Sequence, residues 1–143
     1  MNLKFKYKKI PLTEKIPLFG FSILRPIIPV QLYVKGDKIN YEALIDSGAD
    51  TCVFEGALGE ELGLNVTSGE PVQFSGVQNA EIAKAYLHDI DLNIGGHKLS
   101  MPAIFSFDLS SRGYGILGQK GFFDLFTVKF DYQKEEIELK EKK

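Results

Sequence analysis

The sequence has few of the residues that cross-link small proteins or bind metal ions. Cys52 is the single cysteine among 143 residues, so the chain cannot form an intrachain disulfide. The two histidines, His88 and His97, are isolated, and no cluster of Cys, His, Asp or Glu has the spacing of metal ligands. We therefore expect no metal ion and no other cofactor. The formal net charge of −2 gives no overall field to attract nucleic acid or an acidic membrane, so neither is expected as a partner.

Long apolar runs are also absent. Near the N-terminus, Leu3, Phe5 and Tyr7 alternate with lysines, which interrupt the continuous apolar core that a secretory signal needs. The more apolar stretch 16–34 contains three prolines and an arginine, which are unsuited to a membrane-spanning helix. We therefore expect a cytoplasmic protein without a membrane anchor.

Alternating apolar and polar residues indicate a chain built mainly of short strands. The pattern predicts an N-terminal strand, a helical turn or two over 57–63, and hairpins over 26–45, 72–87 and 126–139. Strands this short, with turn signals this frequent, are typical of an all-β barrel-like domain with one or two short helices. No repeat or linker divides the chain. We expect one domain over residues 26–140, preceded by an N-terminal strand and extension over residues 1–25.

Several conspicuous side chains are interpreted as structural. Asp89 and Asp91 alternate with apolar residues and are expected on a solvated strand face, whereas His88 lies on the apolar face and is expected to be a hydrogen-bonded core residue. The apolar surroundings of Cys52 indicate a buried small hydrophobe. Four phenylalanines are expected to pack in the core: Phe122, Phe123, Phe126 and Phe130.

One turn is hard to explain by structure alone. The apolar residues 43–45 run directly into Asp46, and the turn continues through Ser47, Gly48 and Ala49. An ionised carboxylate at the end of a buried strand loses hydration and needs compensating hydrogen bonds. Ser47 can brace the turn through its hydroxyl, and Gly48 allows a backbone geometry or a close approach that a Cβ would block. The pattern therefore favours a functional role for Asp46.

A second segment, Ile116-Leu117-Gly118, is a short apolar pair closed by glycine and followed by a predicted helical turn. Together with the turn Asp46-Ser47-Gly48-Ala49, it resembles the motifs of the retropepsin-like aspartic proteases in their single-domain form. The resemblance covers roughly residues 28 to 140. It implies a retropepsin-like acid protease barrel over residues 26–140 and an aspartic endopeptidase that hydrolyses polypeptide substrates.

The resemblance also implies roles for the residues of the first motif. Asp46 would be the catalytic carboxylate, and Ser47 would be its hydrogen-bonded brace. Gly48 and Ala49 would form the turn beside the scissile bond. Asp50 would contact the backbone of the substrate.

Two further groups of residues receive roles from the same resemblance. The segment that packs beneath the active-site turn and shapes it would be Ile116, Leu117 and Gly118. A flap hairpin would cover the bound peptide, with contacts from Gly76, Val77 and Ile82.

The chemistry of aspartic proteolysis constrains the assembly. General acid-base hydrolysis by aspartates needs one protonated and one ionised carboxyl group beside the same water. The chain has one Asp-Ser-Gly turn and no internal repeat, so a homodimer would place Asp46 beside its own copy. Many retroviral members have an arginine where this chain has Gln119, so the ion pair between that arginine and Asp50, which would steady the dimer, cannot form.

Two alternatives remain open on the residues alone. A non-catalytic retropepsin-fold module for dimerisation or peptide binding would keep the fold after losing turnover. Its simplest mark would be a damaged Asp-Ser-Gly turn, and here the turn is intact. A thiol hydrolase using Cys52 would be sensitive to alkylation and indifferent to the loss of Asp46.

Overall fold

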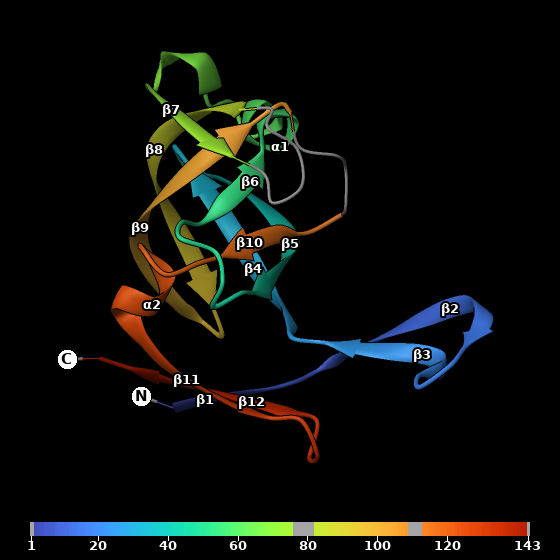
Figure 1. Ribbon diagram of the computed structural model, residues 1–143. Helices are drawn as coiled ribbons and strands as arrows, with labels where there is room; N and C mark the ends of the chain where they lie inside the picture. Colours follow the sequence, from blue (N-terminus) through green and yellow to red (C-terminus); the bar gives the residue numbers. More distant parts are fainter. Residues whose placement is uncertain (1, 76–81, 109–112, 143) are drawn as a thin grey trace.

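The computed structural model describes residues 2–75, 82–108 and 113–142, and strands make up most of this part of the chain (Figure 1). Its helical elements are short: α1 (Gly56–Glu61), α2 (Phe122–Leu125) and the 3-10 turn Val66–Ser68. The expected all-β class with short helices is confirmed. Within the described ranges, no helix combines the length and the hydropathy required to cross a lipid bilayer.

Six strands form a closed barrel. They follow the order β4-β5-β10-β6-β9-β8, and β8 pairs back with β4 to close the ring. Their bounds are β4 Ile27–Val34, β5 Asp37–Ile45, β6 Val53–Glu55, β8 Ile82–Ile94, β9 His97–Ser106 and β10 Gly115–Leu117. A further strand, β7 (Glu70–Ser75), pairs antiparallel with the first half of β8. This closure confirms the barrel expected from the sequence.

The predicted hairpin over 26–45 is confirmed as β4 and β5. Val30, Leu32 and Val34 alternate along β4 and are buried. The connecting loop has two residues, Lys35 and Gly36, with φ of 49° and 88°. Positive φ at both positions matches the twist of the flanking strands, as in a type I′ turn. The turn sets the register of the hairpin, and β5 ends at residue 45, immediately before the Asp46 turn.

A second sheet, of three strands, lies below the barrel in Figure 1 and brings the two ends of the chain together. Its strands, in order, are β1 (Asn2–Lys6), β12 (Glu136–Glu141) and β11 (Phe126–Asp131). Ile137 and Leu139 are buried in the core. The expected N-terminal strand and the final hairpin are therefore confirmed.

The polar strand faces also agree with the sequence pattern. His88 is partly buried, and its Nε2 lies 2.8 Å from the Val66 carbonyl oxygen, as expected for a hydrogen-bonded core residue. Asp89 is exposed. Asp91 accepts a hydrogen bond of 2.5 Å from the Ser100 hydroxyl. The solvated face predicted for the two aspartates is confirmed.

The prediction that four phenylalanines pack in the core is wrong for one of them. Phe122 and Phe126 are buried, and Phe123 packs against the core from its edge. Phe130 is 40% exposed, although it lies on the same side of β11 as Phe126. Alternation predicts which face of a strand points inward, but it does not predict where along the strand the core ends.

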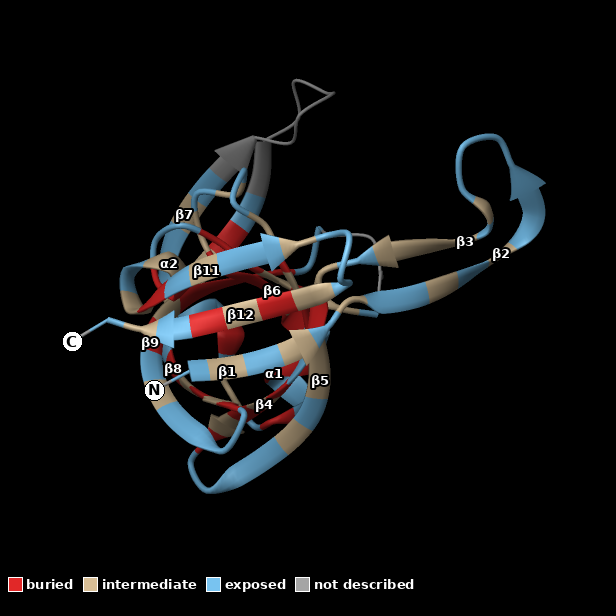
Figure 2. Cartoon of the chain, turned by 90° about the horizontal axis from the view of Figure 1, so that it is seen from below, coloured by how far each residue is buried: buried red, intermediate tan, exposed pale blue. Residues whose placement is uncertain are grey.

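A separate two-stranded sheet forms an arm that projects from the barrel (Figures 1 and 2). It consists of β2 (Lys8–Ile16) and β3 (Gly20–Arg25), which pair antiparallel with each other. The sequence pattern indicates an extension over residues 1–25 but does not predict this hairpin. The arm rejoins the barrel through Pro26, directly before β4.

Phe126 and Phe130 offer a matched test of the core. Phe126→Ala is expected to lower the free energy of unfolding by about 3 to 5 kcal/mol, because it opens a cavity beside Phe122. Phe130→Ala should cost about 1 kcal/mol or less, because its ring already contacts solvent. Urea unfolding at one protein concentration measures both values, and equal losses would contradict the placement of the core.

Candidate active site

Asp46 lies where β5 ends beside β10. The two strands run parallel, with Ile45 opposite Leu117, and the Asp46 amide donates a hydrogen bond of 3.0 Å to the Leu117 carbonyl. Ile45 and Leu117 are buried, whereas Asp46 is partly exposed. The parallel ladder therefore holds the backbone of Asp46 and leaves its carboxylate at the margin of the core.

The chain turns tightly after Asp46. The Gly48 amide donates to Asp46 Oδ1 over 2.9 Å, and the Ala49 amide donates to the Asp46 carbonyl over 3.2 Å. One carboxylate oxygen is thus held by the backbone of its own turn, as in an Asx turn. A Cβ at Gly48 would lie only 3.3 Å from that oxygen. This hydrogen bond and the small size of Gly48 together orient the carboxylate.

Gln119 binds this turn from the segment that follows β10. Its side-chain Nε2 donates to the Ser47 carbonyl over 2.7 Å, and its amide donates to the Ala49 carbonyl over 2.8 Å. The Lys120 amide then donates to the Asp50 carbonyl over 2.9 Å. The residue that replaces an arginine of many retroviral members therefore holds the turn within its own chain. Sequence reasoning missed this role, because nothing local links residues 72 positions apart.

Gly118 lets the two segments approach this closely. A Cβ at Gly118 would lie 2.2 Å from the Thr51 carbonyl oxygen and 2.7 Å from that of Ala49, distances that no side chain can adopt. Ile116, two residues earlier, pairs with Val53 of β6. The structure thus brings the segment Ile116-Leu117-Gly118 against the Asp46 turn, where the sequence resemblance expects it.

The comparisons with known proteins address the same two segments. A family model described as aspartyl protease matches residues 30–120, which include the Asp46 turn and the segment Ile116-Leu117-Gly118. The chain belongs to the aspartyl protease family. The comparison with curated proteins yields no match.

Solved structures resemble this chain in fold. A retropepsin-like aspartic protease from Rickettsia conorii is 14% identical, with a TM-score of 0.58 over 97% of this chain and 98% of that chain. EIAV protease complexed with the inhibitor HBY-793 is 21% identical, with a TM-score of 0.45 over 66% of this chain and 82% of that chain. The first similarity shows that the fold is retropepsin-like, as expected from the sequence.

The structure describes part of the substrate side predicted from the sequence. Ala49 is partly buried, and Asp50 is exposed beside the Asp46 turn. Ile82 begins β8 and pairs with Ser75 of β7, so the strands of the expected flap hairpin are present. Gly76 and Val77 lie outside the described residues. The pairing of β7 with β8 is therefore the part of the flap prediction that the structure describes.

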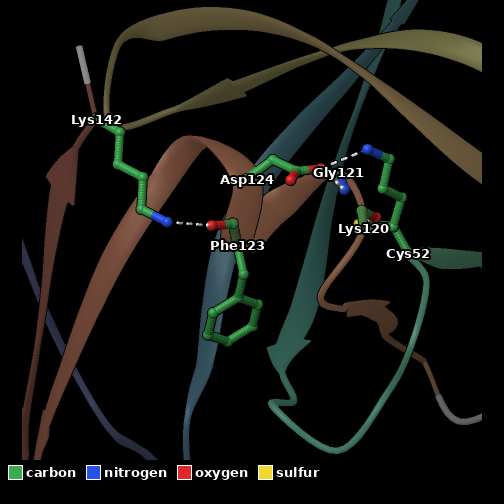
Figure 3. Close-up of polar contacts among 6 residues, drawn as sticks. All are labelled: Cys52, Lys120, Gly121, Phe123, Asp124 and Lys142. Carbon is green, nitrogen blue, oxygen red and sulfur yellow. Dashed lines mark hydrogen bonds and ion pairs between the residues drawn. The ribbon is translucent and has the colours of Figure 1, made fainter.

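Cys52 lies beside Lys120 and Gly121 (Figure 3). The side chain is fully buried, and its Sγ is 3.7 Å from the Lys120 carbonyl oxygen. Burial raises the pKa of the Cys52 thiol, although backbone amides nearby partly oppose the shift. A buried thiol with a raised pKa is a poor nucleophile. This geometry confirms the buried hydrophobe predicted for Cys52 and opposes the thiol hydrolase alternative.

Short-range polar contacts hold α2 in place (Figure 3). The Gly121 amide donates to Asp124 Oδ2 over 2.9 Å, and Lys120 Nζ lies 3.4 Å from the same oxygen. The Gly121 amide, more than any other group, lowers the pKa of Asp124. Lys142 Nζ donates to the Phe123 carbonyl over 2.9 Å and ties the end of the chain to α2. Among the residues that the structure describes, no group of three Cys, His, Asp or Glu side chains could hold a metal ion.

Tyr41 and Glu55 join the two strands that flank β10. Tyr41 lies on β5 and Glu55 on β6, and the tyrosine hydroxyl donates a hydrogen bond to the carboxylate. Burial, followed by the negative charge of Glu55 and this hydrogen bond, raises the pKa of Tyr41 to about 12. The pair therefore braces the barrel around the strand that carries Leu117.

This pair predicts a loss of stability in alkali. Because the pKa of Tyr41 rises from 10.0 to about 12 on folding, the folded protein keeps a proton that the unfolded chain releases. The resulting stabilisation is complete below pH 10 and is lost as the pH rises through the folded value. Urea unfolding across this window should show a steeper loss for the wild type than for Tyr41→Phe. Parallel curves for the two proteins would contradict the assignment.

Proposed function

We propose that this chain is an aspartic endopeptidase that hydrolyses peptide bonds with a pair of Asp46 carboxyl groups, one from each protomer of a homodimer. The observation that carries the proposal is the rigid presentation of Asp46. The parallel strand, the Gly48 amide and Gln119 all hold one turn whose carboxylate remains partly exposed. Membership of the aspartyl protease family supports the proposal.

A second carboxyl group is required by the chemistry. One group must be ionised to take a proton from water, and the other must be protonated to polarise the substrate carbonyl. The sequence contains one Asp-Ser-Gly turn, and the residues that the structure describes form one barrel, which carries that turn. Two-fold symmetry brings the same residue of two protomers together at the axis. The partner's Asp46 is therefore the second carboxyl group of the proposal.

In this dyad the ionised Asp46 removes a proton from the attacking water while its protonated twin donates a hydrogen bond to the carbonyl oxygen of the scissile bond. The roles then reverse, as a proton is delivered to the leaving nitrogen. No acyl-enzyme forms, because water attacks directly. Ser47 and Gly48 would shape the turn around the dyad, and Ile116, Leu117 and Gly118 would support it from beneath.

The peptide would bind in an extended conformation, with its backbone paired as an added strand. Ala49 and Asp50 adjoin the dyad in the same turn and would contact the peptide backbone beside the cleaved bond. From the opposite side, the hairpin of β7 and β8 would cover the peptide through Gly76, Val77 and Ile82. Closing the hairpin over the substrate would exclude bulk water from the dyad.

Asp46→Asn tests the catalytic assignment. The variant should cleave a diverse peptide library at least about a hundredfold more slowly than the wild type, because the amide cannot accept the proton of water. Circular dichroism and urea unfolding should show that it remains folded, since the two side chains are nearly isosteric. Equal turnover by both proteins, with contaminating protease excluded, would refute the proposal.

Cys52→Ala is the matched control for this experiment, because it alters a neighbouring residue that is buried and outside the dyad. It should retain activity, and alkylating agents should not inhibit the wild type. An inactive but folded Cys52→Ala protein would support a thiol enzyme. A wild type that binds peptides as a dimer without cleaving any of them would indicate the non-catalytic module.

Dilution tests the paired mechanism. Below the dimer dissociation constant the two Asp46 residues separate, so the rate per protomer should fall with enzyme concentration. Activity measured over several decades of concentration, alongside mass by sedimentation, gives both curves. A monomer at every concentration that still cleaves peptides at constant specific activity would rule out the dyad.

A further inference from the structure

The arm formed by β2 and β3 lacks the support that usually stabilises a hairpin. Its strands pair only with each other in the described part of the chain, so each has an outer edge without a strand neighbour. An isolated two-stranded hairpin is marginally stable in water, and free strand edges are templates for pairing with another chain. In Figures 1 and 2 the arm extends beyond both the barrel and the terminal sheet.

The tip of the arm concentrates apolar surface. Seven large hydrophobic side chains are exposed in the described part of the chain, and four of them lie between residues 16 and 21. Leu18 is 93% exposed, and its backbone has φ of 79°, which is unfavourable for a leucine. Phe21 is 65% exposed, and the other two are Ile16 and Phe19. Such a clustered apolar tip is typical of an interaction surface.

The base of the arm lies beside the candidate active site. Pro26, which joins the arm to β4, accepts a hydrogen bond of 2.9 Å from the amide of Ile45, the residue before Asp46. Lys8, at the start of the arm, forms an ion pair with Glu42 of β5. A hollow of about 580 Å³ lies between the arm and the barrel. Its lining includes Lys8, Ile10, Glu42 and Tyr114. The arm is therefore tied to the barrel at its base and not packed onto it along its length.

We propose that the arm is a dimerisation arm, whose tip packs on the barrel of a second copy of this chain. The inference rests on the proposed function, in which Asp46 meets its copy at a two-fold axis. The base of the arm would then lie within a few residues of that axis. A nine-residue strand spans about 30 Å, so an arm that starts there can reach far over the partner.

The dimensions of the arm fit this role. Strands of nine and six residues, about 30 and 20 Å long and about 5 Å apart, present roughly 250 Å² on one face, and symmetry supplies two such arms. A standard interface buries about 800 Å² per partner. The arms would thus provide a large share of the contact and stabilise a dimer in which Gln119 cannot form the ion pair expected of an arginine. Burial against the partner would also remove the four apolar side chains of the tip from water.

The test removes apolar surface at the tip and measures mass. The double variant Leu18→Ser/Phe21→Ser should weaken dimerisation by about a hundredfold, because four large side chains per dimer lose their contact. Lys9→Ser/Lys15→Ser is the matched control, since it changes two polar residues of the same arm and should leave the dissociation constant unchanged. Both are compared by sedimentation in the wild-type chain and in the Asp46→Asn chain, so the measurement does not depend on catalysis.

A second measurement does not rely on the double variant folding. A photo-crosslinking amino acid at position 18 should produce covalent dimers, whereas the same group at exposed position 142, near the other end of the chain, should give far fewer. Dimers whose stability is unaffected by the tip variant, and which do not cross-link from position 18, would overturn the arm proposal and leave the catalytic one standing. Arm-dependent dimers without Asp46-dependent cleavage would support the arm and refute the protease.

Two further outcomes would also overturn the arm proposal. In the first, the wild type is monomeric at all concentrations and cleaves peptides through Asp46, which would refute both the arm and the paired dyad. In the second, the tip variant dimerises like the wild type, but the wild type binds vesicles of phosphatidylcholine and phosphatidylserine and the variant does not. That result would assign the apolar tip to a lipid surface.

Discussion

The parallel pairing of β5 with β10 is the constraint on which the rest of the structure depends. Parallel neighbours cannot be joined by a tight turn, so the chain must travel around the barrel before it returns beside its earlier segment. The barrel strands β6, β8 and β9 lie between β5 and β10 in the sequence. On its return the chain supplies the bonds from Leu117, Gln119 and Lys120 that hold the Asp46 turn. The barrel is thus the means by which two distant segments build one rigid turn.

The backbone at Ile45 also connects the proposed dyad with the proposed dimerisation arm. Ile45 is bound on one side by the β10 ladder and on the other by Pro26, the last residue before the arm becomes barrel. The carboxylate of the proposed dyad and the proposed dimerisation arm therefore leave the barrel at adjacent points. A partner seated on the arm would meet the Asp46 turn without any change in the fold.

Burial separates the two reactive side chains of this region. Asp46 and Cys52 are six positions apart, and either could be considered for chemistry from its side chain alone. Asp46 ends a strand at the margin of the core, where a backbone amide compensates its charge. Cys52 lies inside, where the loss of hydration raises its pKa. Because burying a charge is costly, the difference in solvation favours Asp46 over Cys52 as the reactive group.

The sequence by itself determined the strand faces, the hairpins over 26–45 and 126–139 and the position of Asp46, because alternation, turn residues and a carboxylate at the end of a strand are local features. Only the tertiary structure decided that Gln119 binds Ser47, that the core ends before Phe130, and that residues 8–25 form a projecting arm. These outcomes depend on which distant segments become neighbours. Local sequence patterns do not contain that information, since the free energy that decides which segments become neighbours comes from packing the whole chain.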